Sequence, residues 1–287
     1  MNRIIIQLKG GLGNQMFQYA LGRHLAHIHQ CDLKLDISVI QLRHNSSWIT
    51  QRKYELGAFH IQENLCKNTP KNLSSFLKKP LFSKNPTPIL EKDFAFDPSV
   101  FTLKPPLHLI GYWQSEQYFK PIEPILREEF KPKIPFSEVR QALSTHIENS
   151  QSVGVHIRRG DYVSNPISSQ FHGVCSLDYY RQAIEHITSK LPEPYFFIFS
   201  DEPDWVKANL KLSYPHLFIE DPDCYPAFAD MMLLKQCDHQ IIANSTYSWW
   251  AAWLNENPEK IVIAPQKWFQ NPQINTRDLL PESWIKL

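Results

Sequence analysis

The sequence predicts an α/β protein with two domains, each built on a sheet of parallel strands. In the second half, short apolar strands alternate with helical segments, which is typical of βαβ units. The first half opens with a strand, a glycine-containing loop and a helix, which together form the first unit of a doubly wound domain. A chain of 287 residues is long enough to give both domains a substantial core.

In the first half the regular elements are separated by a long irregular stretch at 41–95. The expected elements are, in order, a strand at 3–8, a helix at 16–29, strands at 34–36 and 107–114, and a helix at 115–130 that Pro121 and Pro124 interrupt. The proline-rich segment 131–135 has the composition of a linker. We therefore expect domains at 1–135 and 136–287, with the last helix packing back on the first domain.

The second half is more regular. Its expected helices are 136–149, 177–190, 203–210, 227–236 and 248–255. Its expected strands are 152–157, 195–199, 217–220, 240–243 and 260–264. This alternation predicts a parallel sheet, and in such sheets ligands bind at the carboxyl ends of the strands.

Composition excludes several classes of protein. Thirty basic and 29 acidic side chains give a net charge of +1, which argues against a nucleic-acid-binding protein. Five scattered cysteines without a Cys-x-x-Cys motif indicate reduced thiols rather than a disulfide framework or a zinc site. No signal peptide or membrane-spanning run is visible, so we expect a cytoplasmic protein.

The strand at 152–157 ends in Arg158-Arg159-Gly160-Asp161. Two guanidinium groups present rigid forks of N–H donors that suit a phosphate, and glycine allows a close approach of the backbone. We therefore expect this strand end to hold a phosphorylated ligand, with His156 and Asp161 beside it. The alternative is structural, since arginines often pair with surface carboxylates and aspartate often caps a turn.

Four other segments carry weaker signals. The loop at 9–15 places backbone amides at a helix N-terminus, where anions are favoured, although it also fits a tight structural turn. Asn244-Ser245-Thr246 follows a strand and opens a helix, so it can hold a phosphate or simply cap the helix. Asp230 can bind a ribose or a guanine edge, or serve as a first-turn helix charge. Asp221-Pro222-Asp223 follows a strand and is either a turn or a site for Mn²⁺ or Mg²⁺.

Five motifs in this order resemble the bacterial α1,2-fucosyltransferases, relatives of the α1,6- and protein O-fucosyltransferases. The motifs are Gly10-Gly11-Leu12-Gly13-Asn14-Gln15-Met16-Phe17-Gln18-Tyr19, Gly111-Tyr112-Trp113-Gln114-Ser115-Glu116, His156-Ile157-Arg158-Arg159-Gly160-Asp161-Tyr162, Phe199-Ser200-Asp201 and Asn244-Ser245-Thr246-Tyr247-Ser248-Trp249-Trp250. The resemblance spans nearly the whole chain. It implies a GT-B fold, in which two Rossmann-like domains face each other across a cleft.

The resemblance also implies an activity and which substrate each domain binds. The activity is metal-independent, inverting transfer of L-fucose from GDP-fucose to the 2-hydroxyl of a terminal β-galactoside, as in lactose or a lipopolysaccharide side chain. The first domain would bind the acceptor and the second would bind GDP-fucose. Catalytic roles fall on Arg158, Asp161 and Asn14. Donor contacts fall on His156, Arg159, Asp201, Asp230, Asn244, Ser245, Thr246, Gly11 and Gly13. Acceptor contacts fall on Gln15, Trp113 and Gln114.

The chemistry fits this assignment. Departure of GDP develops negative charge on the β-phosphate, which fixed arginines and amides stabilise without a metal. Asp161 is the first candidate for the base, although a neighbouring arginine weakens a carboxylate as a base, so another residue or the phosphate itself stays open. The alternatives are a metal-dependent transferase that uses Asp221 and Asp223, and a non-catalytic protein that binds glycans or nucleotide sugars. Peripheral contact with the inner membrane also stays open, since such acceptors are often lipid-linked.

Overall fold

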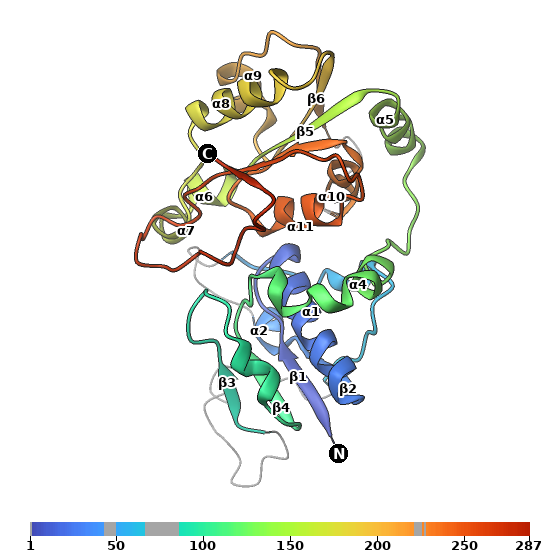
Figure 1. Cartoon of the computed structure of the whole chain (residues 1–287), viewed down its shortest axis with the longest axis vertical. Helices are drawn as coiled ribbons and strands as arrows, with labels where there is room; N and C mark the ends of the chain where they lie inside the picture. The colour runs from blue at the N-terminus through green and yellow to red at the C-terminus, as the bar shows by residue number, and fades with distance from the viewer. Residues whose placement is uncertain (1, 43–49, 67–85, 221–225, 227) are drawn as a thin grey trace. The chain divides into compact units, whose positions relative to one another are not determined.

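A computed structural model of the chain describes residues 2–42, 50–66, 86–220, 226 and 228–287 (Figure 1). It divides into two compact units. The N-terminal unit comprises Met1–Lys133 with Ile274–Pro281, and the C-terminal unit comprises Ile134–Gln273 with Glu282–Leu287. The segment that rejoins the N-terminal unit contains neither a helix nor a strand, whereas we expected a helix there.

The N-terminal unit contains a four-stranded parallel sheet with the strand order β2-β1-β4-β3. Its strands are β1 (Arg3–Gln7), β2 (Asp32–Asp36), β3 (Pro88–Leu90) and β4 (Leu107–Ile110). Its α-helices are α1 (Leu12–His29), α2 (Ser38–Gln41) and α4 (Glu123–Glu129). Short 3₁₀ helices occupy Leu56–Ala58, Pro98–Thr102, Glu116–Tyr118 and Lys120–Ile122. The three consecutive isoleucines of β1 are buried on both faces of the sheet, which is typical of a central parallel strand.

The C-terminal unit contains a six-stranded sheet with the order β10-β9-β8-β5-β6-β7, again all parallel. Its strands are β5 (Gln151–Ile157), β6 (Pro194–Ser200), β7 (His216–Ile219), β8 (His239–Ile241), β9 (Val262–Ala264) and β10 (Ile285–Lys286). Its helices are α5 (Glu138–Glu148), α6 (Gly160–Ser164), α7 (Pro166–Phe171), α8 (Leu177–Thr188), α9 (Pro203–Asn209), α10 (Phe228–Gln236) and α11 (Thr246–Leu254).

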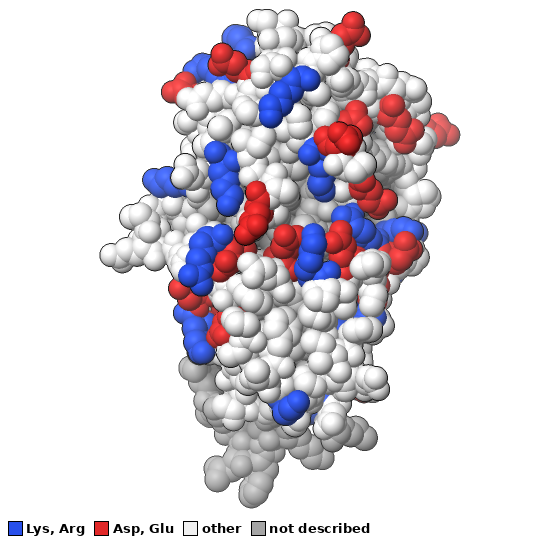
Figure 2. All heavy atoms as spheres, viewed as in Figure 1, with Lys and Arg blue, Asp and Glu red and all other residues white. Residues whose placement is uncertain are grey.

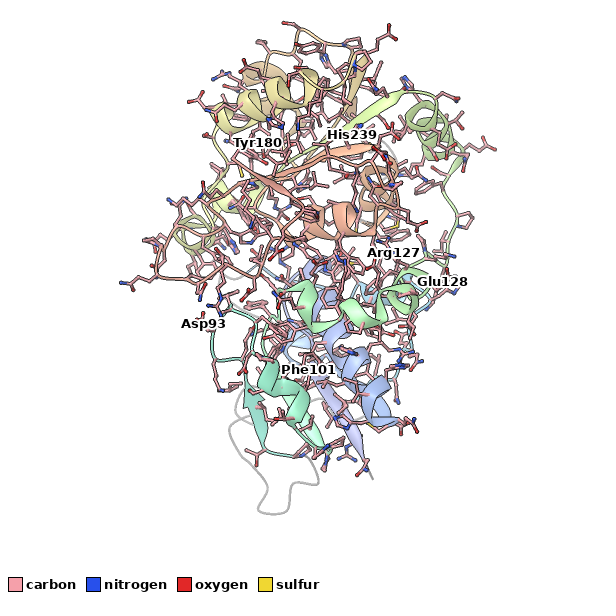
Figure 3. All side chains as sticks on the ribbon, viewed as in Figure 1. Asp93, Phe101, Arg127, Glu128, Tyr180 and His239 are labelled. Atoms are coloured by element: carbon pink, nitrogen blue, oxygen red, sulfur yellow. The ribbon has the colours of Figure 1, made fainter. Side chains whose placement is uncertain are left out.

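A buried apolar layer joins the C-terminal sheet to its helices. Val153, Val155 and Ile157 of β5 pack with the inner face of α8. Tyr180 of α8, labelled in Figure 3, is almost fully buried, and its hydroxyl donates to the His156 carbonyl at 3.2 Å. The end of β5 is therefore held by packing and by hydrogen bonding, so the residues that follow it start from a fixed position.

Each sheet has one topological switch point, where successive connections leave in opposite directions. In the C-terminal unit the chain runs from β5 to β6 and β7 on one side, then places β8 on the other side of β5. In the N-terminal unit β2 lies on one side of β1, and β4 lies on the other. Ligands of open α/β sheets bind at the carboxyl ends of the strands beside such a point. Ligand sites are therefore expected at the ends of β5 with β8 and of β1 with β4.

The expectation of two parallel α/β units is confirmed, with local differences. Helix α1 begins at Leu12 rather than Met16, so Gly13 lies inside its first turn. Strands β3 and β10 and helices α6 and α7 were not expected. The two strands have only 3 and 2 residues, too few to show a period, and the helices begin at Gly-Asp and Asn-Pro pairs that resemble turns.

Basic and acidic side chains are mixed on the face seen in Figure 2, where Lys and Arg lie among Asp and Glu rather than in a basic patch. This agrees with the net charge of +1 and means that any anion site must be built locally.

Candidate active site

Arg158 lies at the carboxyl end of β5, beside the switch point, and is held by two carboxylates. Its Nη2 donates to Asp161 Oδ1 at 2.5 Å, and its Nη1 lies 2.8 Å from Asp201 Oδ2. The guanidinium also lies over the Tyr162 ring, 5.5 Å from its centroid. Burial opposes the charged form, but the two aspartates outweigh it, so the pKa of Arg158 is raised and the group stays cationic. The hydrogen bond to Asp161 uses one of the five N–H donors of the guanidinium, Asp201 is its ion-pair partner, and the side chain is 25% exposed.

The side chain of Arg159 contacts different residues from the side chain of Arg158. Its Nε donates to Glu202 Oε2 at 2.9 Å, and its guanidinium carbon lies 3.3 Å from the centroid of the Trp205 ring. Stacking on an indole and pairing with a carboxylate are the contacts of a structural arginine. The expected donor contact of Arg159 therefore has a competing structural role, and the sequence offered no sign of Glu202 or Trp205 as its partners.

Asp201 follows β6 and joins both arginines. Its Oδ1 accepts from the backbone N–H of Arg159 at 2.9 Å, while Oδ2 faces Arg158. A Cβ atom on Gly160 would lie only 2.4 Å from Oδ2, so the glycine is required for the close approach of this carboxylate. Asp201, expected as a donor contact, is thus placed to fix the direction of the Arg158 side chain.

His156 is buried in β5, two residues before Arg158. Its ring lies 5.4 Å from the Tyr247 ring of α11, and its Nδ1 is a buried atom without a hydrogen-bond partner. Burial, with a smaller contribution from the Arg158 charge, lowers the pKa of His156 to about 3. The imidazole is therefore neutral at physiological pH, and it adds a polar ring to the site without adding charge.

The N-terminus of α11 follows β8 across the switch point from Arg158. Ser245 is the N-cap residue, but its side chain makes no capping hydrogen bond, and the first turn carries no acidic residue. Thr246 begins the helix and is partly exposed. The purely structural alternative for Ser245, a side-chain cap, is thus not what the structure contains. An uncapped helix N-terminus beside an arginine is a favourable environment for an anion.

Asn244 is placed differently from the expected donor contact. Its side chain is buried, and its Nδ2 lies 3.0–3.2 Å from the carbonyl oxygens of His172, Gly173 and Trp268. Cys175 Sγ lies 3.4 Å from Asn244 Oδ1. The amide therefore ties two connecting segments to the end of β8, because one side chain satisfies several buried backbone groups.

Asp230, in the first turn of α10, is paired with a buried arginine. Arg140 Nη1 of α5 lies 2.5 Å from Asp230 Oδ1. The Arg140 side chain is 5% exposed and that of Asp230 is 35% exposed. The carboxylate thus spans from a buried cation to solvent, so the structure allows it a structural and a binding role together. Arg140 was not anticipated, since an arginine in an amphipathic helix is expected on the exposed face.

In the N-terminal unit, Asn14 and Gln114 meet at the switch point between β1 and β4. Gln114 Nε2 donates to Asn14 Oδ1 at 2.9 Å, although the two residues are 100 apart in sequence. Asn14 lies in the first turn of α1, where Gly11 is the N-cap residue and Gly13 follows. The predicted acceptor-side residues Asn14, Trp113 and Gln114 are thus brought together by the fold.

Gln15 is an exception within this group. It is fully buried, its Nε2 donates to the carbonyls of Gly10 and Lys53 at 3.0 and 2.7 Å, and its Oε1 accepts from Glu55 N at 3.0 Å. Both N–H groups and the carbonyl are used by backbone. Gln15 therefore holds the loop that precedes α1, and the structure leaves it no exposed atom for an acceptor.

Trp113 has an unusual backbone conformation. Its φ is +59°, in the left-handed region that is unfavourable for a bulky side chain, and its ring is buried edge-on against Tyr118 with 5.6 Å between centroids. The backbone N–H groups of Tyr112 and Trp113 donate to the two carboxylate oxygens of Glu91 at 2.6 and 2.8 Å. Glu91 was not expected at this site, since it follows a strand too short to be recognised.

The described residues contain no group of three or more His, Cys, Asp or Glu side chains arranged to hold a metal ion. Asp221 and Asp223, the alternative metal ligands, lie outside the described residues. None of the helices that the described residues form is both long and apolar enough to span a bilayer.

Comparison with known proteins identifies the family. The model of glycosyl transferase family 11 matches residues 2–287, nearly the whole chain. The chain belongs to glycosyl transferase family 11. The family 11 chain is 34% identical to an α-1,2-colitosyltransferase of Escherichia coli, with 100% of this chain and 99% of that protein covered. It is 33% identical to the O-antigen biosynthesis glycosyltransferase WbnK of the same species, with 98% and 99% covered. A stretch that makes up 52% of the chain is 30% identical to human galactoside α-(1,2)-fucosyltransferase 1, and it covers 43% of that protein.

Solved structures support the fold of this family 11 chain. NodZ α-1,6-fucosyltransferase co-crystallised with GDP matches 88% of this chain and 92% of its own, with a TM-score of 0.50 at 15% identity. Arabidopsis thaliana FUT1 in complex with GDP matches 91% of this chain and 70% of its own, also with a TM-score of 0.50, at 14% identity. The expected GT-B class is confirmed, and with it the resemblance to fucosyltransferases of this family.

Proposed function

We propose that the protein transfers L-fucose from GDP-fucose to the 2-hydroxyl of a terminal β-galactoside, with inversion and without a metal. The C-terminal unit binds the donor through the ends of β5, β6 and β8, and the N-terminal unit binds the acceptor through the ends of β1 and β4. The observation that carries the proposal is the placement of Arg158 and the α11 N-terminus on opposite sides of one switch point. Two sources of positive potential at such a point suit a diphosphate.

Arg158 stabilises the charge that develops on GDP as the sugar leaves. Its two aspartate partners fix the guanidinium before the donor arrives, so little reorganisation is needed during the reaction. The donors not used in these bonds, together with the N–H groups of the first turn of α11, contact the diphosphate oxygens. His156 contributes a neutral ring beside Tyr247, so it adds a polar group to the donor site but no charge.

Asp161 supports Arg158 in this scheme. Its short contact with the guanidinium and its burial favour a role in holding the arginine, while they disfavour removal of a proton from the acceptor. Asn14 and Gln114 bind the acceptor sugar through their amide groups. Trp113 shapes the acceptor side of the N-terminal unit, where Gly11 is the N-cap residue of α1 and Gly13 is buried in its first turn.

The test is release of GDP from GDP-fucose, measured with and without lactose and with EDTA present. We expect lactose-dependent release that survives EDTA and falls about 100- to 1,000-fold in Arg158→Ala, which is typical for loss of one charge-stabilising donor. Arg181→Ala is the matched control, since Arg181 is 58% exposed and pairs only locally with Asp178. Loss of release in EDTA for the wild type would instead assign the reaction to a metal held by Asp221 and Asp223.

A colitosyl donor is the second candidate. Its support is the 34% identity to an α-1,2-colitosyltransferase over the whole chain. Colitose is L-fucose without its 3-hydroxyl, so a donor site for fucose differs only where it hydrogen-bonds that hydroxyl. Enzymes that bind such a group reject the analogue lacking it by large factors, whereas the reverse discrimination is weaker. The ratio of kcat/KM for GDP-fucose and GDP-colitose therefore decides between the two donors.

A further inference from the structure

Glu91 connects the ends of two neighbouring strands in the N-terminal unit. It directly follows β3, and its own N–H donates to the Ile110 carbonyl at the end of β4, at 2.9 Å. Its carboxylate then accepts from two successive backbone amides, those of Tyr112 and Trp113, one on each oxygen. Three hydrogen bonds thus join one residue to the loop that carries Trp113 and Gln114.

The carboxylate contacts coincide with the strained point of that loop. Two successive amides converge on one acceptor only when the backbone turns sharply, and here the turn is made by Trp113 at φ +59°. A tryptophan has no local reason to adopt this conformation, so the surrounding structure must impose it. The space is tight as well, because a Cβ atom on Gly111 would lie 2.5 Å from Glu91 Cβ and 2.7 Å from Trp113 Cε2.

The consequence of the turn is the position of Gln114. After Trp113 the chain reverses, with Ser115 N donating to Trp113 O at 2.9 Å, and the Gln114 amide reaches Asn14 on α1. On the other side, Gln18 Nε2 of α1 donates to the Gly111 carbonyl at 3.0 Å. The loop is therefore fixed to α1 at both of its ends and to Glu91 in its middle.

The positive charge of Lys9 favours the ionised form of the Glu91 carboxyl group. Its Nζ lies 4.1 Å from the centroid of the Tyr112 ring, and the Glu91 charge acts on it. Burial raises the pKa of Glu91, and the two amide hydrogen bonds and the Lys9 charge offset only part of that rise. A side chain with both carboxyl oxygens accepting from one loop is organised to shape that loop.

We propose that Glu91 is a positioning residue for the acceptor: its carboxylate holds residues 111–114 in the conformation that presents Gln114 beside Asn14. The inference rests on the proposed function for its acceptor, a sugar whose hydroxyl groups bind side-chain amides. It assigns to Glu91 no contact with the donor and no transfer of a proton. Loosening the loop therefore weakens acceptor binding and leaves donor binding unchanged.

The test compares Glu91→Gln with Asp93→Asn. Glutamine keeps the size of the side chain, but its NH₂ group opposes one of the two backbone donors. Asp93 lies exposed two residues further on (Figure 3), and its carboxylate accepts from the amide of the adjacent Phe94, whose ring stacks on Tyr112. Asparagine keeps an acceptor for that amide, so the variant removes a negative charge near Glu91 but no hydrogen bond to the backbone of residues 111–114. We expect Glu91→Gln to raise the acceptor KM about tenfold, with the donor KM within twofold of wild type, and Asp93→Asn to match wild type in both.

Hydrogen exchange at the Tyr112 and Trp113 amides gives a readout that does not depend on activity. We expect both amides to exchange faster in Glu91→Gln, with the exchange of β1 amides unchanged. Equal increases in both KM values, or unchanged exchange at the two amides, would overturn the inference. Lack of lactose-dependent release in the wild type itself would instead count against the proposed function, and the exchange experiment would still decide whether Glu91 holds the loop.

Discussion

Removal of the Asp230 carboxylate tests whether this residue is a structural partner, a donor contact or both. In Asp230→Ala, Arg140 keeps its charge in a site where its side chain is only 5% exposed. Removing one partner of a buried ion pair typically costs about 3–5 kcal/mol, because the remaining charge loses an electrostatic partner. Asp230 is itself 35% exposed, so water replaces part of the lost contact, and we expect about 2–3 kcal/mol. For a unit of this size, that lowers the Tm by roughly 5–12 °C.

The assay is thermal unfolding followed by circular dichroism, combined with calorimetric titration of GDP. A second substitution, Arg140→Met, removes the buried charge and fills its site with an apolar side chain of similar length, so the double variant should recover most of the lost stability. If Asp230 also contacts the nucleotide, the stable double variant will still bind GDP at least tenfold more weakly than wild type. A Tm within 1 °C of wild type for Asp230→Ala would refute the structural argument.

Two further predictions concern the end of β5. Arg159→Met keeps apolar contact with Trp205 but loses the ion pair with Glu202, so we expect the free energy of unfolding to fall by about 1 kcal/mol with little change in donor KM. Arg158→Met, in contrast, should raise the donor KM by at least tenfold. Urea unfolding measures the first effect and donor titration the second. The pKa of His156 is about 3 in the folded protein against an ordinary value near 6.5, so the contribution of the neutral ring to stability is complete above pH 6.5 and falls by up to about 1.4 kcal/mol for each pH unit below it. His156→Gln should therefore flatten the decline in Tm that the wild type shows between pH 6.5 and 5. An equal decline in both proteins would contradict the assignment.

The sequence placed the candidate motifs in the fold better than it assigned their contacts. Motifs that follow a strand, such as those at Arg158 and Ser245, could be placed because a parallel sheet brings the carboxyl ends of neighbouring strands together. Roles could not be assigned, because a polar residue looks the same in sequence whether it faces a ligand or a backbone carbonyl. Gln15 and Asn244 are fully buried among backbone groups, and their partners lie up to 72 residues away.

The same limit explains what was missed. Arg140 and Glu91 are charged residues that sequence patterns place on the surface, and only tertiary packing gives them partners. Their contacts share a form: each polar element of the candidate site is held in place by a charged side chain. Arg158 is held by Asp161 and Asp201, Asp230 by Arg140, and the Gln114 loop by Glu91.

This arrangement has an energetic consequence for the site at the end of β5. Two arginines and three acidic residues, Asp161, Asp201 and Glu202, give the strand end a formal charge of −1 before any donor binds. A diphosphate is therefore not attracted by net charge at this point. In the proposed function it is recognised by direction instead, through the Arg158 donors not used by the aspartates and the N–H groups at the α11 N-terminus. Neutralising Asp201 should then raise the attraction for phosphate while loosening Arg158, so that donor affinity and turnover would change in opposite senses.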